Sequence, residues 1–153
     1  LFKERIIDQP VLYLSYFFKK NKEAENSHLQ SLHDKGTWEQ WLKFFLTGII
    51  ETSKDAIKLT GNIDLLAKEC IGKIITKYGE NKAASHSDIL YYLFQKPVTS
   101  AKNMQDYFEN KSRRYLYDAL SDFEEMGISK EITKQSRNKK YAFTAYLDLL
   151  EKI

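Results

Sequence analysis

The most aromatic part of the chain is residues 9–50, which read QPVLYLSYFFKKNKEAENSHLQSLHDKGTWEQWLKFFLTGII. Pro10 suits the first turn of a helix, and the residue before a proline avoids helical geometry, so we expect a helix to begin there. Gly36 is typical of a helix end, where the chain enters the left-handed conformation. After it, apolar side chains recur at helical spacing from Trp38 to Ile49. The stretch therefore predicts two amphipathic helices joined by a tight turn.

The composition favours helices and excludes several classes of protein. Apolar residues make up 42% of the chain, enough for a core, and only six Gly and two Pro interrupt it. The net charge of +3 is too small to indicate nucleic-acid binding by itself. Cys70 is the single cysteine, which excludes an internal disulfide and fits a reducing compartment. Because the sequence has no secretory signal and no apolar run that could span a membrane, we expect a cytoplasmic protein.

Helical spacing continues beyond the aromatic stretch. The further apolar positions are Ile63, Leu66, Cys70, Ile71, Ile74, Ile75 and Tyr78. They predict one long helix, or two nearly collinear helices, from Thr37 to about Tyr78. Residues 79–87, GENKAASHS, are polar and small, which is typical of a linker. We place a domain boundary there and predict two domains, residues 1–80 and residues 81–153.

The predicted second domain alternates short helices with turn residues. Pro97 ends its first helix, Ser100 and Ser112 are suitable caps for the next two, and Gly127 closes the third. The expected elements are helices at 87–94, 100–108 and 113–126, a β-hairpin at 128–143 with a polar tip, and a last helix at 145–153. This is the order of a winged helix-turn-helix. The predicted fold class is therefore mainly α with a small β-hairpin wing.

Two segments of the first half resemble the C-terminal part of the Fic/Doc family. In that family a PxLYLSxY segment precedes a G-[DT]-W-E-x-W-x-x-F-[FY]-L segment. Residues 10–15, PVLYLS, match the first, with Phe17 where the pattern has its second Tyr, and residues 36–46, GTWEQWLKFFL, match the second. The sequence from Phe123 through Tyr141 is similar to the winged-helix domain often appended to Fic proteins. The resemblance thus covers nearly the whole chain.

The resemblance implies a parent protein that is an adenylyltransferase. Such a protein transfers AMP from ATP, bound with magnesium, to a hydroxyl side chain of a target protein. The family's catalytic motif, HPFxxGNGR, does not occur in this sequence. In family members this motif lies upstream of the matched segments, so the resemblance implies that it precedes Leu1. We therefore expect no catalytic residue and no cofactor for this fragment alone.

Asn26 is the candidate nucleotide-binding residue. In the family, a residue in the helix after PxLYLSxY approaches the adenine, and counting from the motif places that position at Glu25 and Asn26. The Tyr–Tyr pair often found there is missing, but an Asn amide can read an adenine edge. The alternative is that Asn26 belongs to a solvated helix face. No metal site is expected, because one Cys and three dispersed His have no ligand spacing.

Basic residues occur at the two places where a winged helix contacts DNA, the start of its third helix and its wing. The candidate DNA-binding residues are Lys111, Ser112, Arg113, Arg114, Tyr117, Lys134, Arg137, Lys139 and Lys140. Four acids on the same helix argue against DNA binding: Asp118, Asp122, Glu124 and Glu125. The alternative is a protein-interaction or dimerisation module whose basic tip is solvated.

Two functions therefore remain open. The first is a C-terminal fragment of a Fic-family adenylyltransferase with a winged helix for DNA or protein interaction. The second is a winged-helix transcription regulator with an N-terminal helical dimerisation module. The match at residues 36–41 favours the first, since DNA binding does not require it. We also expect the apolar stripe from Phe17 to Phe45 to be covered, either by a second copy of the chain in a homodimer or by a rearrangement of the chain itself.

Overall fold

The computed structural model describes residues 14–151, apart from the side chains of Lys35, Asn81 and Lys82. It divides into two compact units, Leu1–Thr60 and Gly61–Ile153. The described residues form seven helices and one antiparallel sheet of three short strands, so the predicted mainly α fold class is confirmed. The predicted helix start at Pro10 and the predicted end of the last helix lie outside the described residues.

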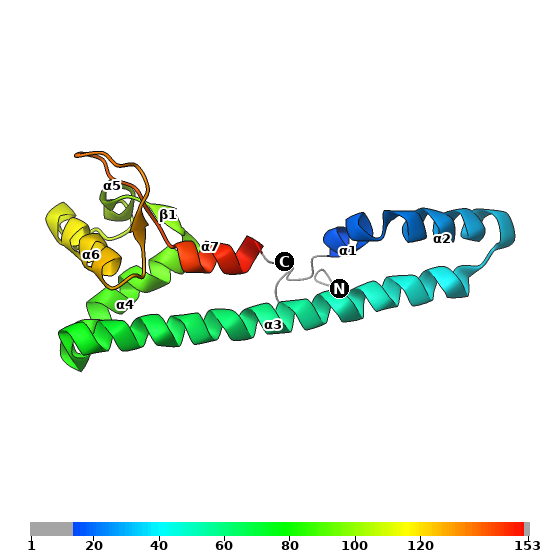
Figure 1. Cartoon of the computed structure of the whole chain (residues 1–153), viewed down its shortest axis with the longest axis horizontal. Helices are drawn as coiled ribbons and strands as arrows, with labels where there is room; N and C mark the ends of the chain where they lie inside the picture. Colours follow the sequence, from blue (N-terminus) through cyan, green and yellow to red (C-terminus); the bar gives the residue numbers. More distant parts are fainter. Residues whose placement is uncertain (1–13, 152–153) are drawn as a thin grey trace. The chain divides into compact units, whose positions relative to one another are not determined.

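The first unit is a helical hairpin. α1 (Leu14–Lys20) and α2 (Lys22–Lys35) lie alongside the beginning of α3 (Trp38–Tyr78) (Figure 1). Gly36 ends α2 with a φ of 66°, and its N–H donates to the carbonyl of Leu32 over 2.9 Å, as expected from the sequence. The helix expected before Gly36 is interrupted at Asn21, whose side-chain amide donates to the carbonyl of Phe17 over 2.9 Å. An Asn that bonds to nearby backbone competes with regular helix, which accounts for the break.

Aromatic side chains close this hairpin. The ring centroids of Phe17 and Phe44 are 5.3 Å apart, and those of Phe18 and Trp41 are 6.3 Å apart. Phe17 is 6% exposed within a single chain, so the chain itself covers this end of the stripe, which is one of the two arrangements expected from the sequence. The large apolar side chains of α3 that remain exposed in this unit are Trp38, Leu42, Leu46, Ile50 and Ile57. A homodimer that covers them stays a prediction.

α3 is one continuous helix that contributes to both units, which is one of the two arrangements expected from its periodicity. Two glycines inside it have different surroundings. A Cβ added at Gly48 would lie 2.6 Å from Cδ1 of Phe17, whereas nothing lies within 4 Å of the same atom at Gly61. The absence of a side chain at Gly48 therefore lets the ring of Phe17 pack against the α3 backbone.

The second unit begins with the end of α3 and continues into α4 (Glu80–Gln95). The prediction that residues 79–87 form a linker is wrong, because Gly79 alone separates the two helices, with a φ of 73°. Ala83 and His86 are buried, and the His86 ring stacks on Tyr78 with centroids 4.0 Å apart. The compact units divide between Thr60 and Gly61, earlier than the boundary expected at residues 80–81.

The rest of this unit has the helix and strand order of a winged helix-turn-helix. After α4 come β1 (Val98–Thr99), α5 (Ala101–Gln105), α6 (Arg113–Glu125), β2 (Lys130–Glu131), β3 (Tyr141–Ala142) and α7 (Thr144–Glu151). The strands are antiparallel in the order β1-β3-β2, with both Val98 and Lys130 opposite Ala142. The predicted caps are present, since the Ser100 hydroxyl accepts from the N–H of Asn103 and the Ser112 hydroxyl from that of Tyr115.

The core of the second unit includes residues from the end of α3. Cys70 and Ile74 are buried with side chains of α4, α5, α6 and β3. Burial raises the pKa of the Cys70 thiol to about 11, although nearby Lys73 opposes this change. Cys70 is therefore a small apolar core residue at neutral pH.

Within the described part of the chain, no helix has both the length and the apolar character needed to cross a membrane.

Candidate nucleic-acid interface

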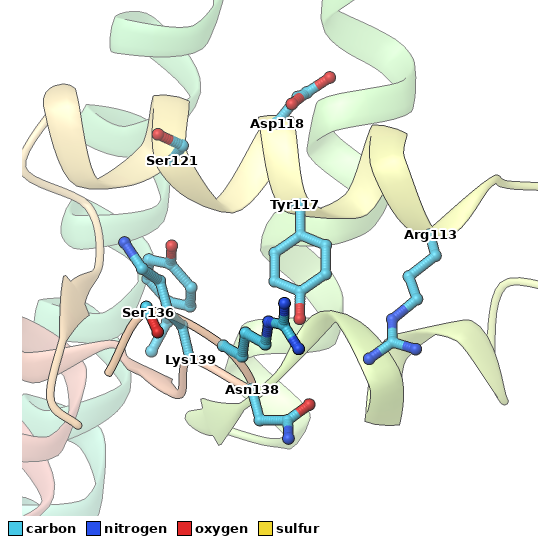
Figure 2. A pocket seen from close by; sticks show the side chains of 9 residues that line it. Arg113, Tyr117, Asp118, Ser121, Ser136, Asn138 and Lys139 are labelled. Atoms are coloured by element: carbon cyan, nitrogen blue, oxygen red, sulfur yellow. The ribbon is translucent and has the colours of Figure 1, made fainter. Parts of the chain in front are cut away.

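A groove lies between α6 and the wing, which we define as residues 132–140 between β2 and β3. Its volume is about 510 Å³. The residues that line it are Arg113, Tyr117, Asp118, Ser121, Ser136, Arg137, Asn138, Lys139 and Tyr141. Arg113 and Tyr117 extend from α6 on the side of the wing, whereas Asp118 points from the opposite side of the helix (Figure 2). The groove is therefore open to solvent and presents cationic side chains from both of its walls.

The α6 wall begins at a well-defined helix start. The Ser112 cap holds the first turn, and the guanidinium carbon of Arg113 lies 5.8 Å from the ring centroid of Tyr117. Lys111 precedes the helix, with its Nζ 5.1 Å from the ring centroid of Tyr115. Cations over aromatic faces lose some freedom of movement without losing their charge. Both side chains are thus held near the α6 N-terminus with their charge intact.

The acids of α6 face other partners. The Nζ of Lys77 lies 2.8 Å from Oδ1 of Asp122 and 2.5 Å from Oε2 of Glu125. The hydroxyl of Tyr78 also donates to Asp122. Burial works against ionisation of Asp122, but the hydrogen bonds from Lys77 and Tyr78 outweigh it and lower the pKa of this carboxyl. These two acids therefore stabilise the contact between α6 and the end of α3.

The two remaining acids are also engaged. A carboxylate oxygen of Glu124 accepts from the backbone N–H of Glu131 at 2.9 Å, which ties α6 to β2. The carboxylate of Asp118 is 3.9 Å from Nε of Arg114, and both side chains are exposed. An exposed ion pair at that distance contributes little to stability. Of the four acids that argued against DNA binding, Asp118 alone lines the groove, where it shares the α6 wall with Arg113, Tyr117 and Ser121.

The wing wall is held at its base. The N–H of Ile132 donates to the carbonyl of Lys140 over 2.9 Å, which closes the two arms. Lys134 and Asn138 both adopt the left-handed conformation, with φ of 52° and 55°. Asn accepts that conformation more readily than most residues, so the turn at Asn138 matches its side chain. Between these positions the tip carries Arg137, and Lys139 follows on the groove side.

The structure brings together some of the predicted DNA-binding residues and not others. Arg113, Tyr117, Arg137 and Lys139 line the groove. Ser112 serves as the cap of α6 and Arg114 lies beside Asp118. Lys134 and Lys140 belong to the wing but do not line the groove. Five lining residues were not among the candidates from the sequence, namely Asp118, Ser121, Ser136, Asn138 and Tyr141. Asn138 carried a usable signal, because an Asn in a polar hairpin tip favours a turn.

The candidate nucleotide-binding residue lies in the first unit. Asn26 is exposed on α2 and lines a shallow hollow together with Lys19, Lys20, Asn21, Lys22, Glu23 and Ala24. No aromatic ring is among the residues that line this hollow, so base stacking has no partner there. Among residues 14–151, no three His, Cys, Asp or Glu side chains gather as a metal site.

Phe17, at the last position of the first matched segment, packs against Phe44 of the second, with ring centroids 5.3 Å apart. The ring of Phe18 lies 6.3 Å from that of Trp41 and 6.2 Å from that of Phe45, centroid to centroid. Trp38, by contrast, is 69% exposed. Neither a protein-family model nor a curated protein matches the sequence. The spacing of Trp41 and Phe45 thus has a structural role in this chain, the closure of the helical hairpin.

Proposed function

We propose that the Gly61–Ile153 unit binds double-stranded DNA, with the start of α6 in the major groove and the wing on the sugar–phosphate backbone. The observation that carries this proposal is the groove between α6 and the wing, where Arg113, Arg137 and Lys139 share one opening. Phosphate contacts by such cations supply most of the sequence-independent affinity for DNA. The N-terminal residues of the third helix are those that reach base edges in helix-turn-helix proteins.

The small net charge does not oppose this function, because the charges are segregated. Lys77 forms ion pairs with Asp122 and Glu125 of α6. Asp118 points away from the wing (Figure 2). The potential that a nearby phosphate experiences is set by charges within about one Debye length, roughly 10 Å at 0.1 M salt. The groove lining itself carries three cations, Arg113, Arg137 and Lys139, and one acid, Asp118.

Removal of two groove cations is expected to weaken DNA binding. The double substitution Arg113→Ala and Arg137→Ala should lower the affinity of the chain for a duplex by roughly ten- to a hundredfold at about 0.1 M salt, because each lost phosphate contact reduces counterion release. The slope of log affinity against log salt should become shallower by about one to two. Fluorescence anisotropy with a labelled duplex measures both quantities.

The matched control removes the same charge elsewhere. Lys54 and Lys58 are exposed on α3 in the first unit. The double substitution Lys54→Ala and Lys58→Ala should leave the affinity within about twofold of the unsubstituted chain, since these lysines contribute only through long-range charge. An equal loss in both double variants would mean that net charge, and not the groove, binds the DNA.

We also propose that the chain is the C-terminal part of a Fic-family adenylyltransferase of the cytoplasm, whose full-length form uses ATP with magnesium and modifies a protein target. Its support is the match at residues 10–15 and 36–46. The test is to read the coding sequence upstream of Leu1. An HPFxxGNGR motif there would support the proposal. Labelling of the full-length protein by ATP should then decrease with Asn26→Ala. The control is Gln30→Ala, at another exposed position of α2, which should leave the labelling unchanged. A coding sequence without the motif would contradict it.

The alternative is a winged-helix transcription regulator that dimerises through its helical hairpin. The observation that favours it is the set of exposed apolar side chains on α3, Trp38, Leu42, Leu46 and Ile50. Exposed apolar patches of this kind commonly mark protein interaction sites. Sedimentation analysis tests this alternative, because it requires a dimer at working concentration. A monomer would contradict it.

A further inference from the structure

Glu131, at the end of β2, bonds to the first residues of the wing. One of its carboxylate oxygens accepts from the backbone N–H of Thr133 and from that of Lys134, each over 2.7 Å. The same oxygen also accepts from the hydroxyl of Thr133. These hydrogen bonds, first of all the one from the Thr133 side chain, lower the pKa of Glu131 below its usual range. The carboxylate is therefore ionised at neutral pH and serves as an acceptor for wing donors.

These bonds lie where the wing backbone departs from regular strand geometry. Lys134, which donates to Glu131, has a φ of 52°, a conformation that costs a residue with a side chain roughly 1 kcal/mol or more. The hydroxyl of Thr133 accepts in turn from the N–H of Lys140 over 3.2 Å, so the same cluster joins both arms of the wing. Glu124 fixes the other end of this arrangement, because it accepts from the N–H of Glu131 at 2.9 Å. A continuous set of hydrogen bonds thus runs from α6 through Glu131 into the wing.

We propose that Glu131 is a positioning residue for DNA binding: it holds the wing in the shape that directs Arg137 and Lys139 toward α6, and it does not touch DNA itself. This inference rests on the DNA-binding function proposed above and adds to it. A wing ordered before binding loses less conformational entropy when its cations meet phosphates. Three donors converge on one oxygen, and hydrogen bonds to a charged acceptor are roughly twice as strong as those to a neutral one. The negative charge of Glu131 therefore has a structural purpose next to a DNA-binding groove.

This role and simple electrostatics predict opposite results for Glu131→Gln in the full chain. The substitution removes a negative charge beside the DNA, so electrostatics alone would tighten binding. Loss of wing order should instead weaken binding by roughly three- to tenfold. The salt slope should stay unchanged, because no phosphate contact is removed. Thr133→Val changes no charge and removes one donor to Glu131, so it should weaken binding in the same way.

The control and a second readout separate this inference from the DNA-binding proposal. Glu109→Gln makes the same chemical change at an exposed position before α6 and should leave binding unchanged or slightly tighter.

In the free protein, amide hydrogen exchange at Thr133 and Lys134 should become about tenfold faster in Glu131→Gln. Unchanged exchange, tighter or unchanged DNA binding, or a shallower salt slope in Glu131→Gln would each overturn the positioning role. Failure of the unsubstituted chain to bind any duplex, with the faster exchange still observed, would overturn the DNA-binding function and leave Glu131 as the residue that orders the wing.

Discussion

A polypeptide of residues 79–153 is expected to be far less stable than one of residues 61–153. The shorter polypeptide lacks the end of α3, which supplies Cys70 and Ile74 to the buried core. It also lacks Tyr78, which stacks on His86, and Lys77, which pairs with Asp122. Complete burial of one aliphatic side chain contributes about 1.5–3 kcal/mol, and a small domain has only about 5–15 kcal/mol in total. Urea denaturation followed by circular dichroism should show a cooperative transition for residues 61–153 and little or none for residues 79–153.

A pair of point substitutions checks the same account without truncation. Ile74 is 0% exposed, whereas its neighbour Ile75 is 39% exposed. In the polypeptide of residues 61–153, Ile74→Ala should lower the free energy of unfolding by about 2–4 kcal/mol and Ile75→Ala by less than about 1 kcal/mol. Equal stability of the two polypeptides, or equal effects of the two substitutions, would contradict the assignment of the α3 end to the winged-helix unit.

Substitution of Gly48 by Ala is expected to destabilise the first unit, although Ala is the better helix former. Propensity alone would stabilise the helix by about 1 kcal/mol. At Gly48, however, the new Cβ would lie 2.6 Å from Cδ1 and 2.7 Å from Cε1 of Phe17. Phe17 is held by Phe18 and Phe44, so its ring cannot move without a loss of packing. Overpacking of this kind costs about 1–3 kcal/mol, which exceeds the gain in propensity.

Gly61 provides the matched control in the same helix. Nothing lies within 4 Å of a Cβ added there, so Gly61→Ala should stabilise the protein by about 0.5–1 kcal/mol. Differential scanning calorimetry should therefore show a lower unfolding temperature for the unit that contains Gly48 in Gly48→Ala, and a higher one for the unit that contains Gly61 in Gly61→Ala. Shifts of the same sign would mean that Phe17 does not pack against Gly48.

Local signals in the sequence predicted much of the fold. The periodicity from Ile63 to Tyr78 predicted the long helix, and Ser100 and Ser112 occupy the cap positions expected for them. Each of these features depends on residues close together in the chain. β1 was missed because its two residues, Val98 and Thr99, become a strand only by pairing with Ala142 and Tyr141.

The errors share a physical cause, which is contact between distant residues. Residues 79–87 resemble a linker in composition, yet Ala83 and His86 are buried because α3 and α6 pack around them. The acids of α6 oppose DNA binding in the sequence, but in the structure Asp122 is paired with Lys77, which lies 45 residues away in the chain. Local patterns carry no information on such pairings. The basic residues of the candidate groove could therefore be predicted from the sequence, but the way α6 and the wing enclose the groove could not.

The most direct test of the DNA-binding function is the salt dependence of duplex binding by the unsubstituted chain. Three to five cations at the start of α6 and on the wing should engage phosphates, which predicts a slope of about −3 to −4.5 for log affinity against log salt concentration. Anisotropy titrations at several salt concentrations between about 50 and 200 mM give this slope directly. No detectable binding at the lowest salt concentration, or a slope near zero, would contradict the account.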